Sequence, residues 1–341
     1  MERYFLPFHR LDSWLGRLMG YYTVFLPAVI ENQVHWHRLT PDDLADKSLE
    51  WGLGHIRASE PIKGFFFSPR EKVASFPEKF EPEDQKKRIL FGVKACDLSA
   101  LKVQQKMFLE GNFRDPFYDA RLKNTILIAA DCSEPEDTCF CNLMGNKPYA
   151  TEGADMTLSV LGEGYLFEVM TGRGNELIDL GGDAFGPVTD AQVARRDENH
   201  KAAVDKLNRI NPRSWNPDLA KAIEGKIQDE AFWRRHAESC VECYGCLLAC
   251  PTCFCFLLYD EAKQTGVERT KVWDACYMAA YARVGGGANP KAEFLKRFMN
   301  RFFCKFVHFK NEHGFYACTG CGRCIKGCMG KIDIRKVLAE L

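Results

Sequence analysis

The sequence predicts two domains: an α/β domain with a mixed sheet in residues 1–226, followed by a helical, cysteine-rich domain in residues 227–341. Three observations predict this division. Strand and helix patterns alternate through the first two hundred residues or so. The chain then becomes polar between about residues 197 and 227, where the segment NPRSWNPD interrupts it, and most of the cysteines follow that interruption. A length of 341 residues suits two domains.

The elements of the first domain follow from hydrophobic periodicity. An amphipathic helix is predicted at 11–20, and strands are predicted at 22–29 and 64–68. The clearest unit is a strand at 88–97, a helix at 98–111 and a strand at 125–132, which together predict a crossover. Residues 155–172 alternate apolar and polar side chains around a glycine-containing turn, which is typical of an antiparallel hairpin.

Two helices are predicted in the second domain. The segment 271–284 places Trp273, Tyr277 and Val284 on one stripe and ends at a run of glycines. The segment 293–310 has phenylalanines at helical spacing beside lysines and arginines. We interpret it as a core helix with a solvated basic face, although a face that docks on a partner is the alternative.

Composition excludes several classes of protein. Because 46 basic residues balance 46 acidic ones, bulk charge gives no reason to expect a nucleic-acid partner. The first twenty residues do not resemble a secretory signal, and no segment is apolar over the length that a bilayer requires. Sixteen cysteines in a chain with ample core residues indicate metal binding rather than a disulfide scaffold. We therefore expect a reducing, cytoplasmic location.

Two runs of cysteines are the strongest indication of function in this sequence. CVECYGCLLACP (residues 240–251) and CTGCGRCIKGCM (residues 318–329) share intervals of two, two and three residues. In such a run three cysteines hold one 4Fe-4S cluster, and the fourth ligates the other cluster. We therefore expect two 4Fe-4S clusters with crossed ligands. The first takes Cys240, Cys243, Cys246 and Cys328, and the second takes Cys318, Cys321, Cys324 and Cys250. A zinc site is the alternative, but it has no use for two runs of this form.

The spacer between the runs is long. About seventy residues, including both predicted helices, separate them, so the second domain is predicted to be a helical ferredoxin-like dicluster domain. Such clusters are also held by electron-transfer subunits of larger enzymes. Four further cysteines in this domain are expected to be buried thiols: Cys253, Cys255, Cys276 and Cys304.

Four cysteines of the first domain are candidates for a third 4Fe-4S cluster. Cys96 and Cys132 end the two strands of the predicted crossover, so both are expected at the same edge of the sheet. Cys139 and Cys141 follow in a loop short enough to fold back over that edge. The alternatives are unligated thiols, or another cofactor such as a flavin with Asp97 at its rim.

Several blocks of the sequence resemble the beta subunits of cytoplasmic sulfhydrogenases and the related A subunit of anaerobic sulfite reductase. These blocks include GFFFSPREKV, FGVKACDLSAL, DTCFCNLMG, PTCFCF, VWDACY and GGANP, together with both cysteine runs. The resemblance implies an iron-sulfur conduit between two partners. One is a flavin-containing subunit that exchanges hydride with a nicotinamide nucleotide, and the other is a catalytic nickel-iron hydrogenase or sirohaem reductase subunit.

The chain lacks the sequence signatures of the partners' chemistry. No G-x-G-x-x-G fingerprint stands between a strand and a helix, and no acid-base or nucleophile constellation is evident outside the cysteines. An electron-transfer subunit of a multi-subunit oxidoreductase is therefore the main hypothesis. Two alternatives remain: the chain itself reduces a sulfur compound or disulfide at a cluster near Cys253 and Cys255, or its clusters are structural or sensing.

Overall fold

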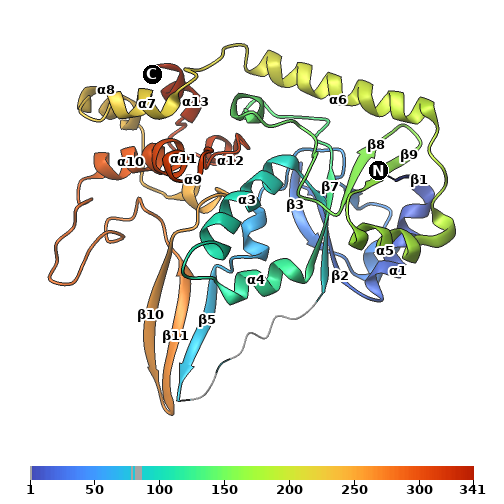
Figure 1. Cartoon of the computed structure of the whole chain (residues 1–341), viewed down its shortest axis with the longest axis horizontal. Coiled ribbons are helices and arrows are strands. Elements are labelled where there is room, and N and C mark those ends of the chain that lie inside the picture. The colour runs from blue at the N-terminus through green and yellow to red at the C-terminus, as the bar shows by residue number, and fades with distance from the viewer. Residues whose placement is uncertain (1, 78–79, 81–86) are drawn as a thin grey trace.

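A mixed sheet organises the first part of the molecule (Figure 1). The structure, a computed structural model, describes residues 2–77, 80 and 87–341. Strands follow the order β1, β9, β8, β7, β6, β2, β3, and β4 pairs with β2. Their bounds are β1 Arg3–Pro7, β2 Thr23–Ile30, β3 Gln33–Arg38, β4 Glu50–Trp51, β6 Arg88–Val93, β7 Thr125–Ala130, β8 Met156–Val160 and β9 Gly164–Val169. The four central strands β2, β6, β7 and β8 are parallel and the outer pairings antiparallel, which confirms the predicted mixed sheet.

Helices cover both faces of this sheet. One apolar core joins the sheet to α1 and α5 and includes Trp14 and Leu177, both fully buried. The other joins it to α3 and α4 and includes Leu101 and Tyr118. The helices of this part are α1 Leu11–Met19, α2 Pro41–Ala45, α3 Ala95–Leu109, α4 Pro116–Lys123, α5 Gly172–Gly181 and α6 Asp190–Ile210, with short 3-10 turns η1 Phe8–Arg10, η2 Ile62–Phe65, η3 Cys141–Met144 and η4 Gly182–Ala184.

The predicted crossover and hairpin are confirmed, and the strand predicted at 64–68 is wrong. Strand β6, helix α3 and strand β7 form the parallel crossover, and β8 with β9 forms the hairpin. The segment 64–68 instead continues the turn of η2, where the amides of Phe66 and Phe67 both donate to the Lys63 carbonyl at 3.0 and 2.7 Å. The turn lets two consecutive phenylalanines bury together, whereas successive side chains of a strand point to opposite faces.

The last third of the chain is largely helical. Its helices are α7 Leu219–Gly225, α8 Glu230–Ala237, α9 Gly245–Leu248, α10 Phe294–Phe302, the π-helix η5 Phe303–His308, α11 Phe309–His313, α12 Arg323–Lys326 and α13 Ile334–Ala339. α10, η5 and α11 follow one another without a break and confirm the helix predicted at 293–310.

The helix predicted at 271–284 is wrong. Its first residues belong to β11 Gly266–Trp273, which pairs with β10 Phe256–Lys263, and the rest is turns. The aromatic residues of the predicted stripe instead contact different parts of the molecule. Trp273 Nε1 donates to the Phe67 carbonyl at 3.0 Å, and the Tyr277 hydroxyl donates to the Phe298 carbonyl at 3.2 Å.

A three-stranded antiparallel sheet joins the two parts. Strand β5 Arg70–Phe76, from the first part, pairs with β11, which pairs with β10. We call this sheet the β arm; it projects from the body of the molecule in Figure 1. Long-range pairing of this kind ties residues on both sides of position 226 together, and the domain boundary placed there stays a prediction.

Candidate metal centres

The two cysteine runs adopt the same backbone conformation. Positive φ angles occur at equivalent positions, 48° at Glu242 and 60° at Tyr244 in the first run, and 68° at Gly320 and 73° at Gly322 in the second. Each run then enters a short helix, α9 or α12, that carries its third cysteine. Glu242 and Tyr244 hold a conformation that side-chain-bearing residues rarely adopt, which marks the first run as a constrained loop.

The second run packs closely on the loop that carries two cysteines of the first part. A Cβ atom on Gly320 would lie 2.5 Å from the Phe140 carbonyl oxygen, and one on Gly322 would lie 2.4 Å from that of Thr138. The Phe140 amide also donates to the Gly320 carbonyl at 2.8 Å. Glycine is therefore required at both positions, since no other residue allows this approach.

Four cysteines from both runs surround one small cavity. Cys240, Cys243 and Cys246 of the first run line it together with Cys328 of the second, and Tyr277, Phe298 and Arg301 complete its wall. Cys328 is among the groups close enough for their charge to raise the pKa of Cys246. We call a group that shifts another's pKa in this way its electrostatic neighbour. The fourth cysteine of the second run thus lies beside the first three of the other run.

The reciprocal arrangement holds at the second run. Cys318 has Cys324 and Cys250 among its electrostatic neighbours, and Cys324 has Cys321 and Cys250. Cys250, the last cysteine of the first run, is therefore brought to the second run. Cys324 also has Cys246 as a neighbour, so the two sets adjoin.

The four cysteines of the first part also gather, at the carboxyl edge of the sheet. Cys141 has Cys132 and Cys139 as electrostatic neighbours, and Cys96 has Cys141 and Cys321. The placement of Cys96 differs from the prediction, because β6 ends at Val93 and Cys96 lies in the first turn of α3. Cys96 nevertheless lies at the edge of the sheet where the strand, helix and strand order predicted it.

Buried cations flank all three sets. Arg301 is 5% exposed and has Cys246 and Cys324 as neighbours; Lys305 is 5% exposed and has Cys250 and Cys318 as neighbours. Arg57, 5% exposed, neighbours Cys139, Cys321 and Cys96. Among the described residues no carboxylate lies within ion-pair distance of Arg301 or Lys305, and the Nε atoms of Arg57 and Arg301 have no hydrogen-bond partner.

These cations fit an anionic group held by the thiolates. An uncompensated buried charge is costly. Arg57 has the Glu136 carboxylate at 3.6 Å, whereas among the described residues the cysteines supply the negative charge next to Arg301 and Lys305. Burial lowers the pKa of Arg301, but the thiolates of Cys246 and Cys324 outweigh it, so that this pKa is raised. Burial also raises the pKa of both Cys318 and Cys324 to about 12. Without a metal these thiols would be neutral, so thiolate formation here is coupled to metal binding.

The basic face of α10 and η5 is therefore not solvated, contrary to the sequence prediction. Arg297, Arg301 and Lys305 are all buried, and only Lys296 of the four basic residues is exposed. Arg297 pairs with Glu242 of the first run at 2.7 Å and donates to the Tyr277 carbonyl at 2.7 Å. These arginines support the cysteine loops and cannot form a docking face.

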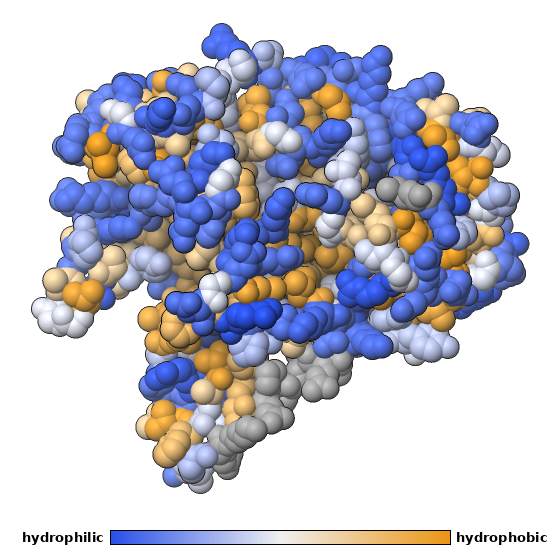
Figure 2. Space-filling view, in the orientation of Figure 1, coloured by the Kyte–Doolittle hydropathy of each residue, from blue (hydrophilic) through white to orange (hydrophobic). Residues whose placement is uncertain are grey.

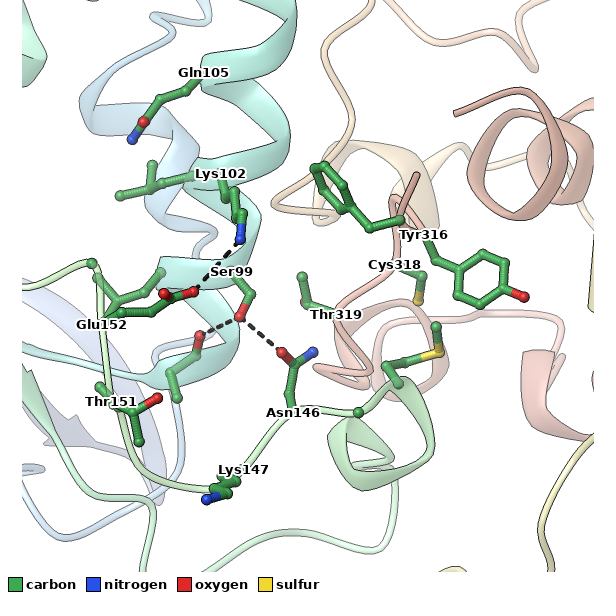
Figure 3. A pocket seen from close by; sticks show the side chains of 18 of the residues that line it. Ser99, Lys102, Gln105, Asn146, Lys147, Thr151, Glu152, Tyr316, Cys318 and Thr319 are labelled. Carbon is green, nitrogen blue, oxygen red and sulfur yellow. Dashed lines mark hydrogen bonds and ion pairs between the residues drawn. The ribbon is translucent and has the colours of Figure 1, made fainter. Parts of the chain in front are cut away.

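A larger cavity of about 670 Å³ lies between α3 and the second run (Figure 3). Lys102, Asn146 and Thr319 are among its lining residues, and Cys318 lies on the same wall as Thr319. Ser99 Oγ lies 3.1 Å from Asn146 Oδ1 across the cavity floor, and Lys102 pairs with Glu152 at 3.5 Å. The cavity thus brings solvent close to the second cysteine set.

The described residues contain neither a site for a single metal ion nor a membrane-spanning helix. No group of three or more His, Cys, Asp or Glu side chains is arranged around a single metal ion, in the way a structural zinc site requires. No helix there combines the length and apolar character needed to cross a bilayer.

Comparison with known proteins agrees with this geometry. Residues 239–332 match the family described as a 4Fe-4S dicluster domain. The chain is 32% identical, over 295 residues, to the sulfhydrogenase 2 subunit beta of Pyrococcus furiosus, and the match covers 86% of each chain. The chain belongs to the family of sulfhydrogenase beta subunits. No solved structure matches it. As a member of this family with a dicluster domain, it is an iron-sulfur electron-transfer subunit that binds 4Fe-4S clusters.

Sequence reasoning missed two features of the site. The buried cations Arg57, Lys63, Arg301 and Lys305 were not recognised, because a lysine or arginine near cysteines has no sequence signature of burial. The surroundings of Cys276 were hidden by the wrong helix at 271–284. The blocks PTCFCF and VWDACY were the available signal, since both contain cysteines outside the two runs.

Proposed function

We propose that this chain relays electrons between two partners in a cytoplasmic complex. One is a flavin-containing subunit that exchanges hydride with a nicotinamide nucleotide. The other is a catalytic subunit, either a nickel-iron hydrogenase or a sulfite or sulfur reductase. The name of the relative, a sulfhydrogenase subunit, supports a multi-subunit assembly.

The observation that carries the proposal is the continuity of the three cysteine sets. The first set adjoins the second through Cys246 and Cys324, and the second adjoins the third through Cys321 and Cys96. We assign Cys240, Cys243, Cys246 and Cys328 to one 4Fe-4S cluster, Cys318, Cys321, Cys324 and Cys250 to a second, and Cys96, Cys132, Cys139 and Cys141 to a third. When bound, each cluster supplies a site for one-electron transfer.

The surrounding residues would set how that transfer proceeds. Phe298 and Tyr277 are buried and shield one side of the first set, while its Cys243 is exposed. The buried cations Arg301, Lys305 and Arg57 favour the more negative, reduced state of a neighbouring site. The chain thus contributes a row of shielded, electrostatically tuned positions.

The β arm is our candidate for contact with a partner subunit. Phe256, Leu258, Val267 and Phe76 are each at least 41% exposed. Strand register and pleat alternation place them on one face, because Val267 is paired with both Ala262 and Phe76. Figure 2 shows hydrophobic residues gathered on this projecting part of the molecule. The exposed Asp260–Arg269 ion pair lies between Leu258 and Val267 on this face. Exposed apolar side chains interspersed with charges on a protruding sheet are typical of an interaction surface.

The test of the relay is to compare overall and partial reactions of the purified complex. In a Cys246→Ser variant that still co-purifies with its partners, electron transfer from reduced nicotinamide to the catalytic subunit should fall below about a tenth of wild type. Dye-linked reactions of each partner alone should persist. An unchanged overall reaction would refute the relay.

The third set has its own test. Cys139→Ala should remove about four iron atoms from the anaerobically purified chain, the content of one cube. Asn142→Ala, one residue from Cys141, is the matched control and should leave the iron content unchanged. An iron content that is unaffected by Cys139→Ala would show that these thiols are unligated.

A further inference from the structure

Four cysteines lie outside the three sets described above. They are Cys253, Cys255, Cys276 and Cys304, which the sequence suggests are ordinary buried thiols. The structure brings them together from three separate segments. Cys253 and Cys255 lie between α9 and β10, Cys276 follows β11, and Cys304 lies in the π-helix η5.

Strand pairing draws the first two segments together. Phe256 is paired with Trp273 at the base of the β10–β11 hairpin, and just beyond this pair the Asp274 amide donates to the Cys255 carbonyl at 3.0 Å. Cys276, two residues further along, is thereby held beside Cys255. The side chains of these two cysteines influence each other's pKa.

The π-helix supplies the third segment. Cys304 has Cys255 and Cys250 among its electrostatic neighbours, and Cys276 has Cys304 among its own. Cys253 has Cys250 as an electrostatic neighbour and shares the neighbour Lys63 with Cys255. A π-helical turn inside an α-helix often marks a functional site, because the extra residue redirects side chains. Here that turn carries both Cys304 and Lys305.

Two buried lysines face these thiols, as buried cations face the other sets. Lys63 is 2% exposed, and its Nζ donates to the Cys253 carbonyl at 3.2 Å and the Leu247 carbonyl at 3.4 Å. Lys305 Nζ donates to Thr252 Oγ1 at 2.8 Å and has Cys253 and Cys304 as neighbours. Within the described part of the chain neither lysine has a carboxylate at ion-pair distance. The buried charge of Lys305 requires a compensating anion where this set meets the second one, whereas burial lowers the pKa of Lys63.

We propose that Cys253, Cys255, Cys276 and Cys304 hold a fourth 4Fe-4S cluster, next to the second cysteine set. A redox-active dithiol would need only two of these thiols. The C-x-C spacing of Cys253 and Cys255 does not match the C-x₂₋₄-C pairs of structural zinc sites. Every one of the sixteen cysteines would then be a cluster ligand. The inference extends the ligand sets of the proposed function and is independent of which partners the chain has.

The test is the iron and acid-labile sulfide content of the anaerobically purified full chain. Wild type should contain nearly sixteen iron atoms, and Cys276→Ala and Cys304→Ala should each lose about four while the remaining EPR signals persist. Tyr281→Phe is the matched control, because Tyr281 and Cys255 influence each other's pKa but Tyr281 is not a proposed ligand. It should retain the full iron content. Cys255 should also resist alkylation until iron is chelated.

Two results would overturn the proposal. One is an iron content that neither Cys276→Ala nor Cys304→Ala changes. The other is about one zinc per chain that both substitutions remove while iron stays constant, which would indicate a zinc site. Since these variants leave Cys246 and Cys139 untouched, failure here is separable from failure of the relay.

Discussion

Buried arginine and lysine side chains determine the electrostatic environment of the cysteine sites. Arg301 is the clearest case, because it lies in α10 between Cys246 of the first set and Cys324 of the second and has no carboxylate partner among the described residues. A fixed charge in this position favours addition of an electron to either neighbouring site.

Arg301→Gln should therefore lower the reduction potential of the neighbouring clusters. A unit charge about 8 Å away at an effective dielectric constant of about 20 contributes roughly 2 kcal/mol, or about 90 mV for one electron. EPR-monitored redox titration measures the shift. Arg301→Lys retains the charge and should restore most of the potential. Lys296→Gln, at an exposed position of the same helix, should cause no shift. Equal shifts in Arg301→Gln and Lys296→Gln would exclude a local effect.

Cys250 tests the crossing of ligands between the runs. Its neighbours Cys318 and Cys324 belong to the second run, so Cys250→Ala should damage the cluster held by that run and leave the first run's signal. The iron content should fall by about four atoms. Loss of the first run's EPR signal alone, or retention of both signals, would contradict the crossed assignment.

At the scale of elements, a buried ion pair fastens α12 to α3. Arg323 Nη1 and Nη2 lie 2.7 and 2.9 Å from the two carboxylate oxygens of Asp97, and Arg323 Nε donates to the Ala58 carbonyl at 3.0 Å. Both side chains are at most 3% exposed. This bidentate pair fixes the helix of the second run against the sheet that carries the third cysteine set.

Asp97→Asn should destabilise the protein by about 3 kcal/mol, since it removes the bidentate carboxylate partner of the buried Arg323 charge. Denaturant unfolding of the anaerobically purified chain measures this change. Lys102→Gln removes an exposed pair on the same helix and should cost less than about 1 kcal/mol. A similar cost for both variants would mean that the buried pair is not a specific fastening.

The apolar face of the β arm gives a prediction for assembly. Leu258→Glu with Val267→Glu should prevent co-purification of the partner subunit, because two charges would be buried in an apolar contact. Leu257→Glu is the matched control, since Leu257 is at least as exposed as Leu258 and Val267 but points to the opposite face of the strand. Co-purification that survives the double substitution would remove the arm as a docking surface.

Local patterns and long-range contacts differ in how far the sequence reveals them. The β6–α3–β7 crossover and the β8–β9 hairpin are predictable because their periodicity and turns are local. The structure of segment 271–284 is not predictable in this way, because its first residues pair with strands β10 and β5. Strand β5 lies about two hundred residues away in the sequence. The motif spacing predicts the two runs, but the convergence of Cys255, Cys276 and Cys304 depends on that same pairing and on a π-helical turn.

At the scale of the whole molecule, the proposed function makes the chain a conduit for electrons. The cysteine sets form a row through the interior, and the described residues offer buried cations and packed aromatics around them. The chemistry that transfers hydride or reduces a terminal substrate is assigned to partners. The isolated chain should therefore exchange single electrons but complete no reaction.

The most direct measurement is EPR-monitored reduction of the isolated chain and of the chain with its flavin-containing partner. Isolated, its clusters should be reduced reversibly by a low-potential dye and remain oxidised with a reduced nicotinamide nucleotide alone. Adding the partner should allow the nucleotide to reduce them. Direct reduction by the nucleotide, turnover of a sulfur compound by the isolated chain, or clusters inert to the dye would contradict the account.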